Sequence, residues 1–562
     1  MIHLIPAVKS LELTGGNLEK KAVLCPAGLD SRLAAAAAKL PNASDGAALT
    51  IAINGAEGEG YQIWVRKDAI EVAADSPAGA FYAIQTLRQL FKNETVPCLH
   101  IADKPDFPHR GFYHDVTRGK VPTVESLKEL IDTMAYYKLN SLQLYVEHTY
   151  PFAQCKELAE KMGHLTAREL QEIDSYCREN FIDFIPSLST FGHLFELLNL
   201  EKHRHLQVLH PYTPSRNFWQ ERMAHHTIDP RNPESLALIQ SLIDQYAPNF
   251  TSETFNICCD ETFDLKIFGD EAGKLYVDFV KKIIAHVKAK DKKVMMWADI
   301  LLKHPEVIEE IPEDTIFLNW NYQAAPPEAT VVKFKELGRK QIVCPGTTTW
   351  NRLCERVEVE EKNISLMAEY GYKHGALGVL NTNWGDWGNP CSVELALYGL
   401  VLGAEKSWTV ATPVDDAFYA RVDALLYGFS GAMAMLKKVS ALHDGLIWKN
   451  FVNAYFKYCC DGQQTPDAIT PQIIADAQQL YAEVKAGLQS PWGWDECRKE
   501  LLLCAEGLCV IAELMGKMAG IPVQQITDTR AWVAAYRESW LRKNKPSELD
   551  NITDKFLRCE EC

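Results

Sequence analysis

Two adjacent carboxylates, Asp260 and Glu261, stand at the end of a short apolar segment, residues 254–259. Nearly every residue of this segment is apolar, which is typical of a strand buried on both faces. A carboxylate buried there without a partner would cost several kcal/mol or have a raised pKa. The pair therefore has to face water, a positive charge or a ligand. Helix capping by Asp260 is the alternative interpretation, because Asp is common where a helix begins.

Short apolar segments alternate with longer segments of helical period from about residue 105 onward. One of the helical segments opens with a capping box made of Thr166 and Glu169. Strands are predicted at residues 111–116, 141–146, 183–188, 254–259, 293–298, 315–320, 341–345 and 375–381, and helices at 124–138, 166–180, 271–288 and 360–374. Eight parallel βα units predict the α/β class and, within it, a (β/α)8 TIM barrel.

Polar and aromatic side chains follow each predicted strand. In chain order they are Arg118, Glu147 with His148, His193, Asp260 with Glu261, Trp297 with Asp299, Trp320 with Asn321, Trp350 with Asn351, and Trp384 with Asp386. The active site of such a barrel lies just beyond the C-terminal ends of its strands. Indole faces cover the C–H surface of a pyranose, while acids and amides bind its hydroxyls. The pattern therefore indicates a sugar-binding site.

The chain is predicted to have three parts. Residues 1–104 indicate a small α+β domain, with a hairpin near residues 61–72 and a helix from Pro77. Residues 105–410 contain the barrel. Residues 411–562 indicate a helical region, with helices predicted at 415–427, 471–488, 496–518 and 527–542. We find no catalytic motif in the first or the third part.

Composition disfavours several classes of partner. The net charge is -16 and no run of Lys and Arg stands out, so we expect no nucleic-acid partner and no binding to an anionic membrane surface. The sequence has no apolar stretch of about 18 residues and does not begin like a secretory signal. Sixteen scattered cysteines suggest free thiols and a reducing compartment, and we expect a cytoplasmic protein. A homo-oligomer is compatible with this composition.

Histidines gather near the third predicted strand, but their spacing matches no metal-ligand pattern. They are His193, His203, His205, His225 and His226. We expect no metal and no cofactor.

The order and spacing of several motifs resemble glycoside hydrolase family 20, the β-N-acetylhexosaminidases. The motifs are Arg110-Gly-Phe-Tyr-His-Asp-Val-Thr-Arg118, Lys138-Leu-Asn140, Phe191-Gly-His193, Ile228-Asp-Pro-Arg-Asn-Pro-Glu234, Asp260-Glu261 and Trp384-Gly-Asp386. The resemblance spans roughly residues 50–405, and the first domain looks like the α+β domain that precedes the barrel in that family.

The resemblance implies a retaining exo-β-N-acetylhexosaminidase that removes terminal β-linked GlcNAc or GalNAc from an oligosaccharide or glycoconjugate. In this family the substrate's own 2-acetamido group is the nucleophile. The resemblance makes Glu261 the general acid and base, with a raised pKa, and makes Asp260 the residue that orients the acetamido group. The implied substrate-binding positions are Arg118, His193, Trp297, Trp320, Trp384 and Asp386, and we add Glu147, His148, Trp350 and Asn351 from their places after the strands.

The sequence departs from the family pattern at several positions. The residues before the acidic pair are Asn256-Ile-Cys-Cys259 where His-x-Gly-Gly is usual, and residues 145–150 replace a Trp-rich run that ends in paired aspartates. No Tyr is present near Thr349, where the family has the Tyr that donates to the acetamido oxygen. Asp386 stands where Glu is more common. These departures leave open which sugar is preferred.

Two other functions remain open from the residues alone. A related β-glycosidase acting on a different sugar would need an enzymic nucleophile, for which Glu147 is the candidate. A catalytically silent sugar-binding protein would keep the pocket without the chemistry. The linkage, the aglycone, the oligomeric state and the role of the helical region do not follow from these residues.

Overall fold

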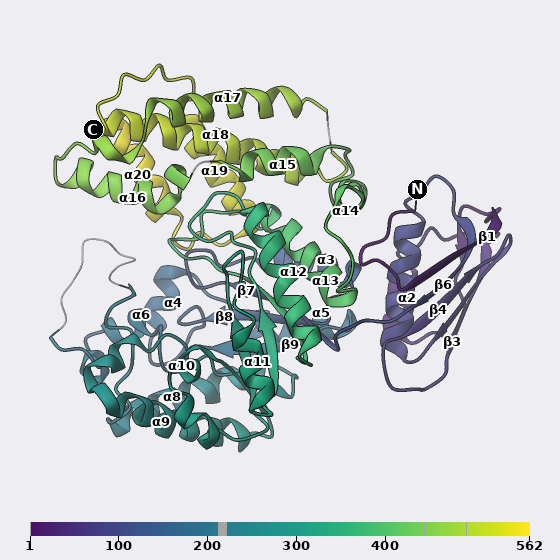
Figure 1. Ribbon diagram of the computed structural model, residues 1–562, viewed down its shortest axis with the longest axis horizontal. Helices are drawn as coiled ribbons and strands as arrows, with labels where there is room; N and C mark the ends of the chain where they lie inside the picture. The colour runs from purple at the N-terminus through teal and green to yellow at the C-terminus, as the bar shows by residue number, and fades with distance from the viewer. Residues whose placement is uncertain (1, 212–221, 443, 491) are drawn as a thin grey trace.

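The structure is a computed structural model that describes residues 2–211, 222–442, 444–490 and 492–562. It has three parts, as Figure 1 shows: an N-terminal sheet, a central barrel and a C-terminal group of helices that lies over one side of the barrel. The predicted fold class is confirmed. No helix in the described ranges is long and apolar enough to cross a membrane.

The N-terminal part is a six-stranded sheet with two helices. In sheet order the strands are β1 (Ser10–Asn17), β6 (Pro97–Asp103), β4 (Tyr61–Val65), β5 (Ala69–Ala74), β3 (Ala47–Ile53) and β2 (Val23–Leu24), and the helices are α1 (Ser31–Ala37) and α2 (Pro77–Leu90). The predicted hairpin is confirmed, because β4 and β5 pair antiparallel with Ile63 opposite Val72. Ser76 caps α2, and Pro77 takes its first position, where no N–H is needed.

The barrel contains all eight predicted strands, which pair in parallel and close into a ring. They are β7 (His109–Asp115), β8 (Ser141–Val146), β9 (Asp183–Leu188), β10 (Thr254–Asn256), β11 (Lys293–Trp297), β12 (Ile316–Trp320), β13 (Gln341–Cys344) and β14 (Gly378–Asn383). Close packing of β7 against β14 requires a glycine, because a Cβ at Gly378 would lie 2.1 Å from the carbonyl oxygen of His109.

The helices of the barrel alternate with its strands. They are α3 (Val124–Tyr136), α4 (Lys156–Met162), α5 (Ala167–Glu179), α6 (Phe195–Asn199), α8 (Pro233–Tyr246), α9 (Ala272–Lys288), α10 (Asp299–Lys303), α11 (Ala329–Glu336), α12 (Val357–Lys373) and α13 (Leu397–Trp408). The capping box predicted for α5 is present, with Thr166 and Glu169 each accepting from the other's backbone N–H.

The C-terminal part consists of packed helices, as predicted. They are α14 (Asp416–Val422), α15 (Ala432–Ser440), α16 (Trp448–Tyr455), α17 (Pro471–Gly487), α18 (Asp495–Met518), α19 (Thr529–Lys543) and α20 (Leu549–Glu561). Three of them, α15, α16 and α20, were not predicted. Backbone hydrogen bonds join this part to loops at the barrel mouth: Trp448 N–H donates to the Asn351 carbonyl (3.1 Å), and Lys545 N–H donates to the Val121 carbonyl (2.8 Å).

The N-terminal domain and the barrel share buried polar contacts. Lys138 Nζ lies 3.3 Å from Asp103 Oδ2 and donates to the Tyr61 hydroxyl (2.7 Å). Trp408 Nε1 donates to both oxygens of Asp103 at 3.0 Å. A carboxylate buried at such a boundary is stable only with partners of this kind, so these contacts fix the domain against the barrel.

Candidate active site

The chain turns sharply where β10 ends and the acidic pair begins. β10 stops at Asn256, earlier than the predicted residue 259, and the Asn256 side-chain oxygen accepts the N–H of Cys258 (2.9 Å). Cys258, Cys259 and Glu261 have φ angles of 56°, 67° and 49°. Residues other than glycine rarely adopt this left-handed conformation, and it is found more often at functional sites than elsewhere. The two cysteines therefore keep a backbone conformation that glycines would adopt freely.

One imidazole lies against both carboxylates of the pair. His193 Nε2 lies 3.3 Å from Asp260 Oδ2 and 3.3 Å from Glu261 Oε2. His193 itself has a φ angle of 56°, and its backbone N–H donates to His226 Nδ1 (2.8 Å). Burial disfavours the charged imidazolium, but Asp260 and then Glu261 outweigh it and raise the pKa of His193 to about 10. The three side chains thus form a cluster that carries a proton on His193 at neutral pH.

The pKa of Glu261 is opposite to the sequence-based expectation. Burial would raise this pKa, as expected, but the hydrogen bond and charge of His193, followed by the charge of Arg118, outweigh burial and lower it to about 2. The prediction of a raised pKa is therefore wrong for the free site, because it left out the cation that the neighbouring strand contributes. In the free site Glu261 is a carboxylate and the proton stays on His193.

Arg118 joins the acidic side chains of two other strand ends. Its Nη1 donates to Asp386 Oδ1 (2.5 Å), and its Nε lies 3.5 Å from Glu147 Oε1. Its guanidinium carbon lies 4.9 Å from the ring centroid of Tyr145 and 5.1 Å from that of Trp384. Hydrogen bonds and ring contacts on several sides hold the planar guanidinium in one orientation, as recognition of a ligand requires.

Asp115 connects the two loops that carry Arg118 and Asp386. Its Oδ1 accepts the backbone N–H groups of Thr117 (2.9 Å) and Arg118 (3.0 Å), and its Oδ2 accepts the N–H of Gly385 (3.0 Å). This side chain is fully buried, and its Oδ2 lies 3.8 Å from Arg118 Nη1. It was not among the predicted residues, although its place at the end of β7 is the signal that could have indicated it.

Glu147 and His148 lie behind Arg118. The Tyr145 hydroxyl donates to Glu147 Oε1 (2.8 Å), and burial raises the pKa of Glu147 although Arg118 opposes the shift. His148 Nδ1 lies 3.7 Å from Glu147 Oε2, and burial lowers the pKa of His148 to about 4. Because Glu147 already accepts from Tyr145 and lies 3.5 Å from Arg118, it is better placed to orient Arg118 than to act as a nucleophile. His148 is neutral beside it.

Four predicted tryptophans lie at two depths. Trp297 is fully buried, and its ring packs against those of Tyr113 and Trp384, with centroid distances of 5.2 Å and 5.7 Å. Trp320 and Trp350 are partly exposed, and each packs against Tyr322, with ring centroids 5.2 Å and 5.0 Å apart. Trp384 and the outer group therefore form an aromatic wall, and Trp297 lies beneath it.

Tyr322 is a candidate residue that the sequence analysis missed. Its hydroxyl oxygen accepts the indole N–H of Trp384 (2.7 Å), and burial raises its pKa well above the ordinary value. The hydroxyl therefore keeps its proton and can donate it to a ligand. The family resemblance places the tyrosine near Thr349, but the Thr349 hydroxyl donates to Asn383 Oδ1 (2.6 Å). Tyr322 lies two residues after Trp320, so the two side chains point to the same side of an extended chain. This spacing was the signal in the sequence that could have indicated Tyr322.

Asn351 connects the site to the helical region. Its backbone N–H donates to the Asp386 carbonyl (3.1 Å), and its side-chain oxygen accepts the N–H of Lys449 (2.6 Å) at the start of α16. Because that oxygen already accepts a hydrogen bond, these contacts indicate that Asn351 has a structural role at the edge of the site.

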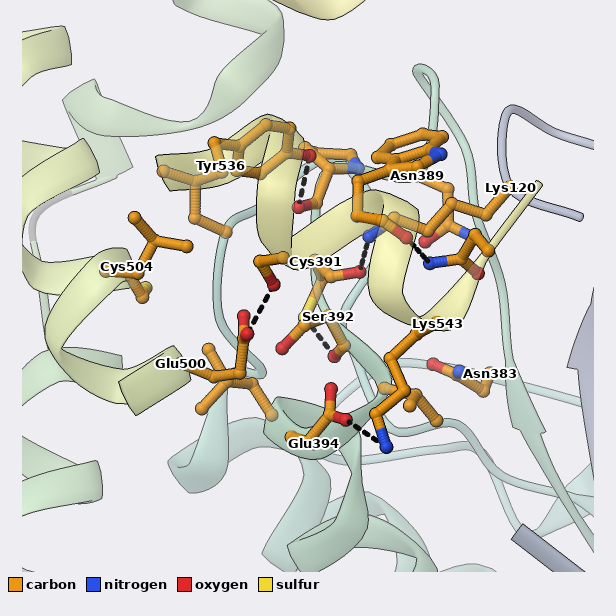
Figure 2. A pocket seen from close by; sticks show the side chains of 18 of the residues that line it. Lys120, Asn383, Asn389, Cys391, Ser392, Glu394, Glu500, Cys504, Tyr536 and Lys543 are labelled. Atoms are coloured by element: carbon orange, nitrogen blue, oxygen red, sulfur yellow. Dashed lines mark hydrogen bonds and ion pairs between the residues drawn. The ribbon is translucent and has the colours of Figure 1, made fainter. Parts of the chain in front are cut away.

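A separate cavity of about 40 Å³ lies between the barrel and helices α18 and α19. Figure 2 shows Lys543 reaching toward Glu394 across it, with an Nζ to Oε1 distance of 3.6 Å, and Glu500 on a neighbouring wall. Lys120 donates to the Cys391 carbonyl at its edge. This volume has room for only a few water molecules and is too small for a pyranose, so we do not assign it to the sugar site. In the described ranges no group of three or more His, Cys, Asp and Glu could hold a metal ion.

Comparison with protein families places the chain. The model of "Glycosyl hydrolase family 20, catalytic domain" matches residues 107–370, and "Glycosyl hydrolase family 20, domain 2" matches residues 1–104. Together with the barrel and its acidic pair, these matches show that the chain belongs to glycoside hydrolase family 20.

Curated relatives match only in part. A beta-hexosaminidase of Akkermansia muciniphila is 32% identical over 162 residues, which are 24% of this chain and 32% of that protein. A beta-hexosaminidase of Emericella nidulans is 24% identical over 294 residues, 45% of this chain and 47% of that protein. The chain therefore spans about a third of the first relative and about half of the second.

Solved structures share the fold. A GH20 exo beta-N-acetylglucosaminidase of Vibrio harveyi aligns with a TM-score of 0.60 at 18% identity over 75% of each chain. A chitobiase of Flavobacterium johnsoniae aligns with a TM-score of 0.62 at 16% identity over 98% of this chain and 99% of that one. The second alignment extends over the helical region as well as the barrel.

Proposed function

We propose that the protein is a retaining exo-β-N-acetylhexosaminidase that hydrolyses terminal β-linked GlcNAc or GalNAc, with the 2-acetamido group of the substrate as nucleophile. The observation that carries the proposal is the cluster in which His193 contacts both Asp260 and Glu261 at 3.3 Å. Two adjacent carboxylates that share one proton donor fit a mechanism in which the protein needs an acid and an orienting anion but no nucleophile of its own.

In the first step the acetamido oxygen forms a bond to C1 while the bond between C1 and the glycosidic oxygen breaks. Glu261 gives its proton to the departing oxygen, and Asp260 stabilises the positive charge that develops on the oxazolinium ring. In the second step water attacks C1, the bond from C1 to the acetamido oxygen breaks, and Glu261 accepts the proton of the water. Two displacements at C1 retain the configuration.

The acid form of Glu261 arises through His193. In the free site the proton is on His193, which lies 3.3 Å from Glu261 Oε2. When the acetamido N–H engages Asp260, one of the two carboxylates that hold the imidazolium is partly neutralised. The proton then moves more easily from His193 to Glu261, which is where the leaving group needs it.

The remaining residues orient the sugar. Arg118 and Asp386 hold ring hydroxyls, and Trp320, Trp350 and Trp384 pack against the apolar face and the acetamido methyl group. Tyr322 donates its hydroxyl proton to the acetamido oxygen, which points that oxygen toward C1.

Paired chromogenic substrates test the proposal as a whole. A β-N-acetylglucosaminide and the matching β-glucoside, which lacks the acetamido group, should differ strongly, and only the first should be cleaved at a useful rate. A thiazoline that mimics the oxazolinium ion should inhibit the enzyme. Equal cleavage of both substrates would contradict the proposal and would make Glu147 the nucleophile to test.

The Tyr322→Phe variant should lower kcat/KM for the acetamido substrate by about 10- to 100-fold, because a hydrogen bond that orients the nucleophile is lost. The phenyl ring keeps the packing against Trp320 and Trp350, but the buried indole N–H of Trp384 loses its acceptor, so the melting temperature should fall modestly while the fold persists. Tyr372→Phe, which removes a hydroxyl from an exposed tyrosine, is the matched control. An unchanged kcat/KM in Tyr322→Phe would exclude this role.

The pH dependence of His193→Asn should differ from that of the wild type. Loss of the imidazolium removes the main influence that lowers the pKa of Glu261, so burial should raise this pKa. With His193 present, the cluster keeps its proton until pH approaches the His193 pKa of about 10. Without it, the acid form of Glu261 is lost at lower pH. The alkaline limb of kcat/KM should therefore move to lower pH in the variant, and an unmoved limb would contradict this assignment.

A further inference from the structure

Two loops at the barrel mouth carry the pair of side chains that holds ring hydroxyls in the proposed function. Residues 116–123, which follow β7, contain Arg118, and residues 384–392, which follow β14, contain Asp386. We call them the Arg118 loop and the Asp386 loop. Helices α16, α19 and α20 belong to the C-terminal part, which lies over one side of the barrel (Figure 1), and together they contact both loops.

The Arg118 loop pairs with the segment that joins α19 to α20. Lys545 N–H donates to the Val121 carbonyl (2.8 Å), and the N-cap residue of α20 donates its N–H to the Gly119 carbonyl (3.3 Å). Val121 N–H donates in turn to Ser547 Oγ (3.2 Å). Because Gly119 directly follows Arg118, these hydrogen bonds fix the chain immediately after the guanidinium-bearing residue.

The two loops meet at a pair of glycines beneath α20. A Cβ at Gly119 would lie 2.3 Å from the Gly388 carbonyl oxygen, so the loop backbones are in direct contact. A Cβ at Gly388 would lie 3.6 Å from Cγ1 of Ile552, which belongs to α20. In such close packing a shift of α20 or of one loop displaces the other loop as well.

The Asp386 loop holds residues 387–389 in the left-handed region, with φ angles of 68°, 95° and 53°, although only the middle one is a glycine. This conformation is costly for other residues and persists only where surrounding contacts fix it. Two hydrogen bonds from the helical region contribute to that. Trp448 Nε1 donates to the Trp387 carbonyl (2.7 Å), and the Tyr536 hydroxyl donates to the Pro390 carbonyl (2.9 Å).

We propose that the helical region positions Arg118 and Asp386 through these contacts and thereby sets the affinity of the site for ring hydroxyls. Ser547 and Trp448 are then positioning residues, because their side chains hold loop backbones rather than the substrate. Arg118 Nη1 and Asp386 Oδ1 lie 2.5 Å apart, and a displacement of about an ångström in either loop is enough to weaken their grip on a sugar. The inference rests on the proposed function, which makes this pair a sugar-binding pair.

Two substitutions each remove one contact to a loop. Ser547→Ala removes the acceptor of the Val121 N–H, and Trp448→Phe removes the donor to the Trp387 carbonyl but keeps a ring against Phe556. In the full chain each should raise KM for a chromogenic β-N-acetylglucosaminide by about 3- to 10-fold, the factor that corresponds to the net loss of a hydrogen bond. The calorimetric Kd of the thiazoline should rise by the same factor. The kcat should stay within about twofold, because hydroxyl contacts hold the bound substrate and the transition state alike.

Two matched controls remove contacts of the same kind elsewhere in the helical region. Ser440 Oγ accepts the N–H of Val357 at the start of α12 (2.7 Å), and Trp532 Nε1 donates to the Leu503 carbonyl of α18 (2.9 Å). Ser440→Ala and Trp532→Phe should lower the melting temperature about as the loop-contact variants do, yet leave KM and the thiazoline Kd unchanged. A purely structural role would lower the melting temperature in all four variants and change KM in none.

Wild-type KM and Kd in both loop-contact variants would overturn the proposal. An equal rise in the controls would also overturn it, because that would indicate a general loosening of the helical region. Failure of the wild type to cleave the β-N-acetylglucosaminide would instead refute the proposed function. If such a protein still bound the thiazoline, the comparison of Kd values would decide on the positioning role, and a wild type that neither cleaved nor bound would refute both proposals.

Discussion

Glu261→Gln is expected to lower kcat on a β-N-acetylglucosaminide with a poor leaving group by about 10²- to 10⁴-fold, the range that general acid–base catalysis contributes. The amide has nearly the same shape but cannot give a proton to the departing oxygen or take one from water. The contacts that hold the backbone in place, such as the hydrogen bond from Glu261 N–H to Asp299 Oδ2 (3.2 Å), do not involve the replaced group. The fold should therefore persist.

The leaving group separates proton donation from other losses. A dinitrophenyl glycoside departs without much help from an acid, so the first step should be affected less in the variant than with a methylumbelliferyl or disaccharide substrate. Glu313→Gln makes the same change at an exposed position and should have wild-type kcat. An equal loss on all leaving groups would show that Glu261 does not donate the proton, and wild-type kcat on all of them would remove it from the mechanism.

The barrel was predictable because its strands have a local signature. Strands of a closed parallel barrel are buried on both faces, so β8 and β13 are buried along their whole length and mostly apolar, and the capping box at Thr166 marks the start of α5. Parallel strands bring their carboxyl ends to one side of the barrel, where the active site lies. The positions of four residues after these ends therefore predicted them as site residues from the sequence alone: Arg118, His193, Asp260 and Glu261. Helices such as α16 lack a comparable cap and were missed.

The electrostatics of the site were not predictable from local sequence. The low pKa of Glu261 depends on His193, which β9 and its loop bring from 68 residues earlier in the chain. Tyr322 occupies a strand end next to Trp384 although the family pattern places its tyrosine at another strand. The φ angles of Cys258 and Cys259 show that residues other than glycine hold the left-handed conformation at this turn. The pKa of Glu261, the position of Tyr322 and the φ angles of the two cysteines all depend on tertiary contacts, so the local sequence does not predict them.

Asp260→Asn is expected to lower kcat/KM on acetamido substrates by about 10²- to 10³-fold. The substitution removes a preorganised negative charge that faces the developing oxazolinium ion. The amide still fits the space, but it does not offset the positive charge of the oxazolinium ring. Residual cleavage of a substrate without the acetamido group, if any is measured in the wild type, should be nearly unchanged, because that reaction forms no oxazolinium ion. The affinity for the thiazoline inhibitor should fall together with kcat/KM.

The same substitution also acts on His193, which loses one of the two carboxylates that hold its proton. The pKa of His193 should fall, so part of the loss should depend on pH and the other part should not. Measuring kcat/KM from acid to alkaline pH separates these two effects. Loss of charge stabilisation lowers kcat/KM at every pH, whereas the lower pKa of His193 moves the alkaline limb of the profile. Glu147→Gln provides the contrast: it should raise KM through Arg118 and leave kcat largely intact. If Glu147→Gln abolished kcat while Asp260→Asn did not, the nucleophile would be enzymic and the substrate-assisted mechanism would be wrong for this chain.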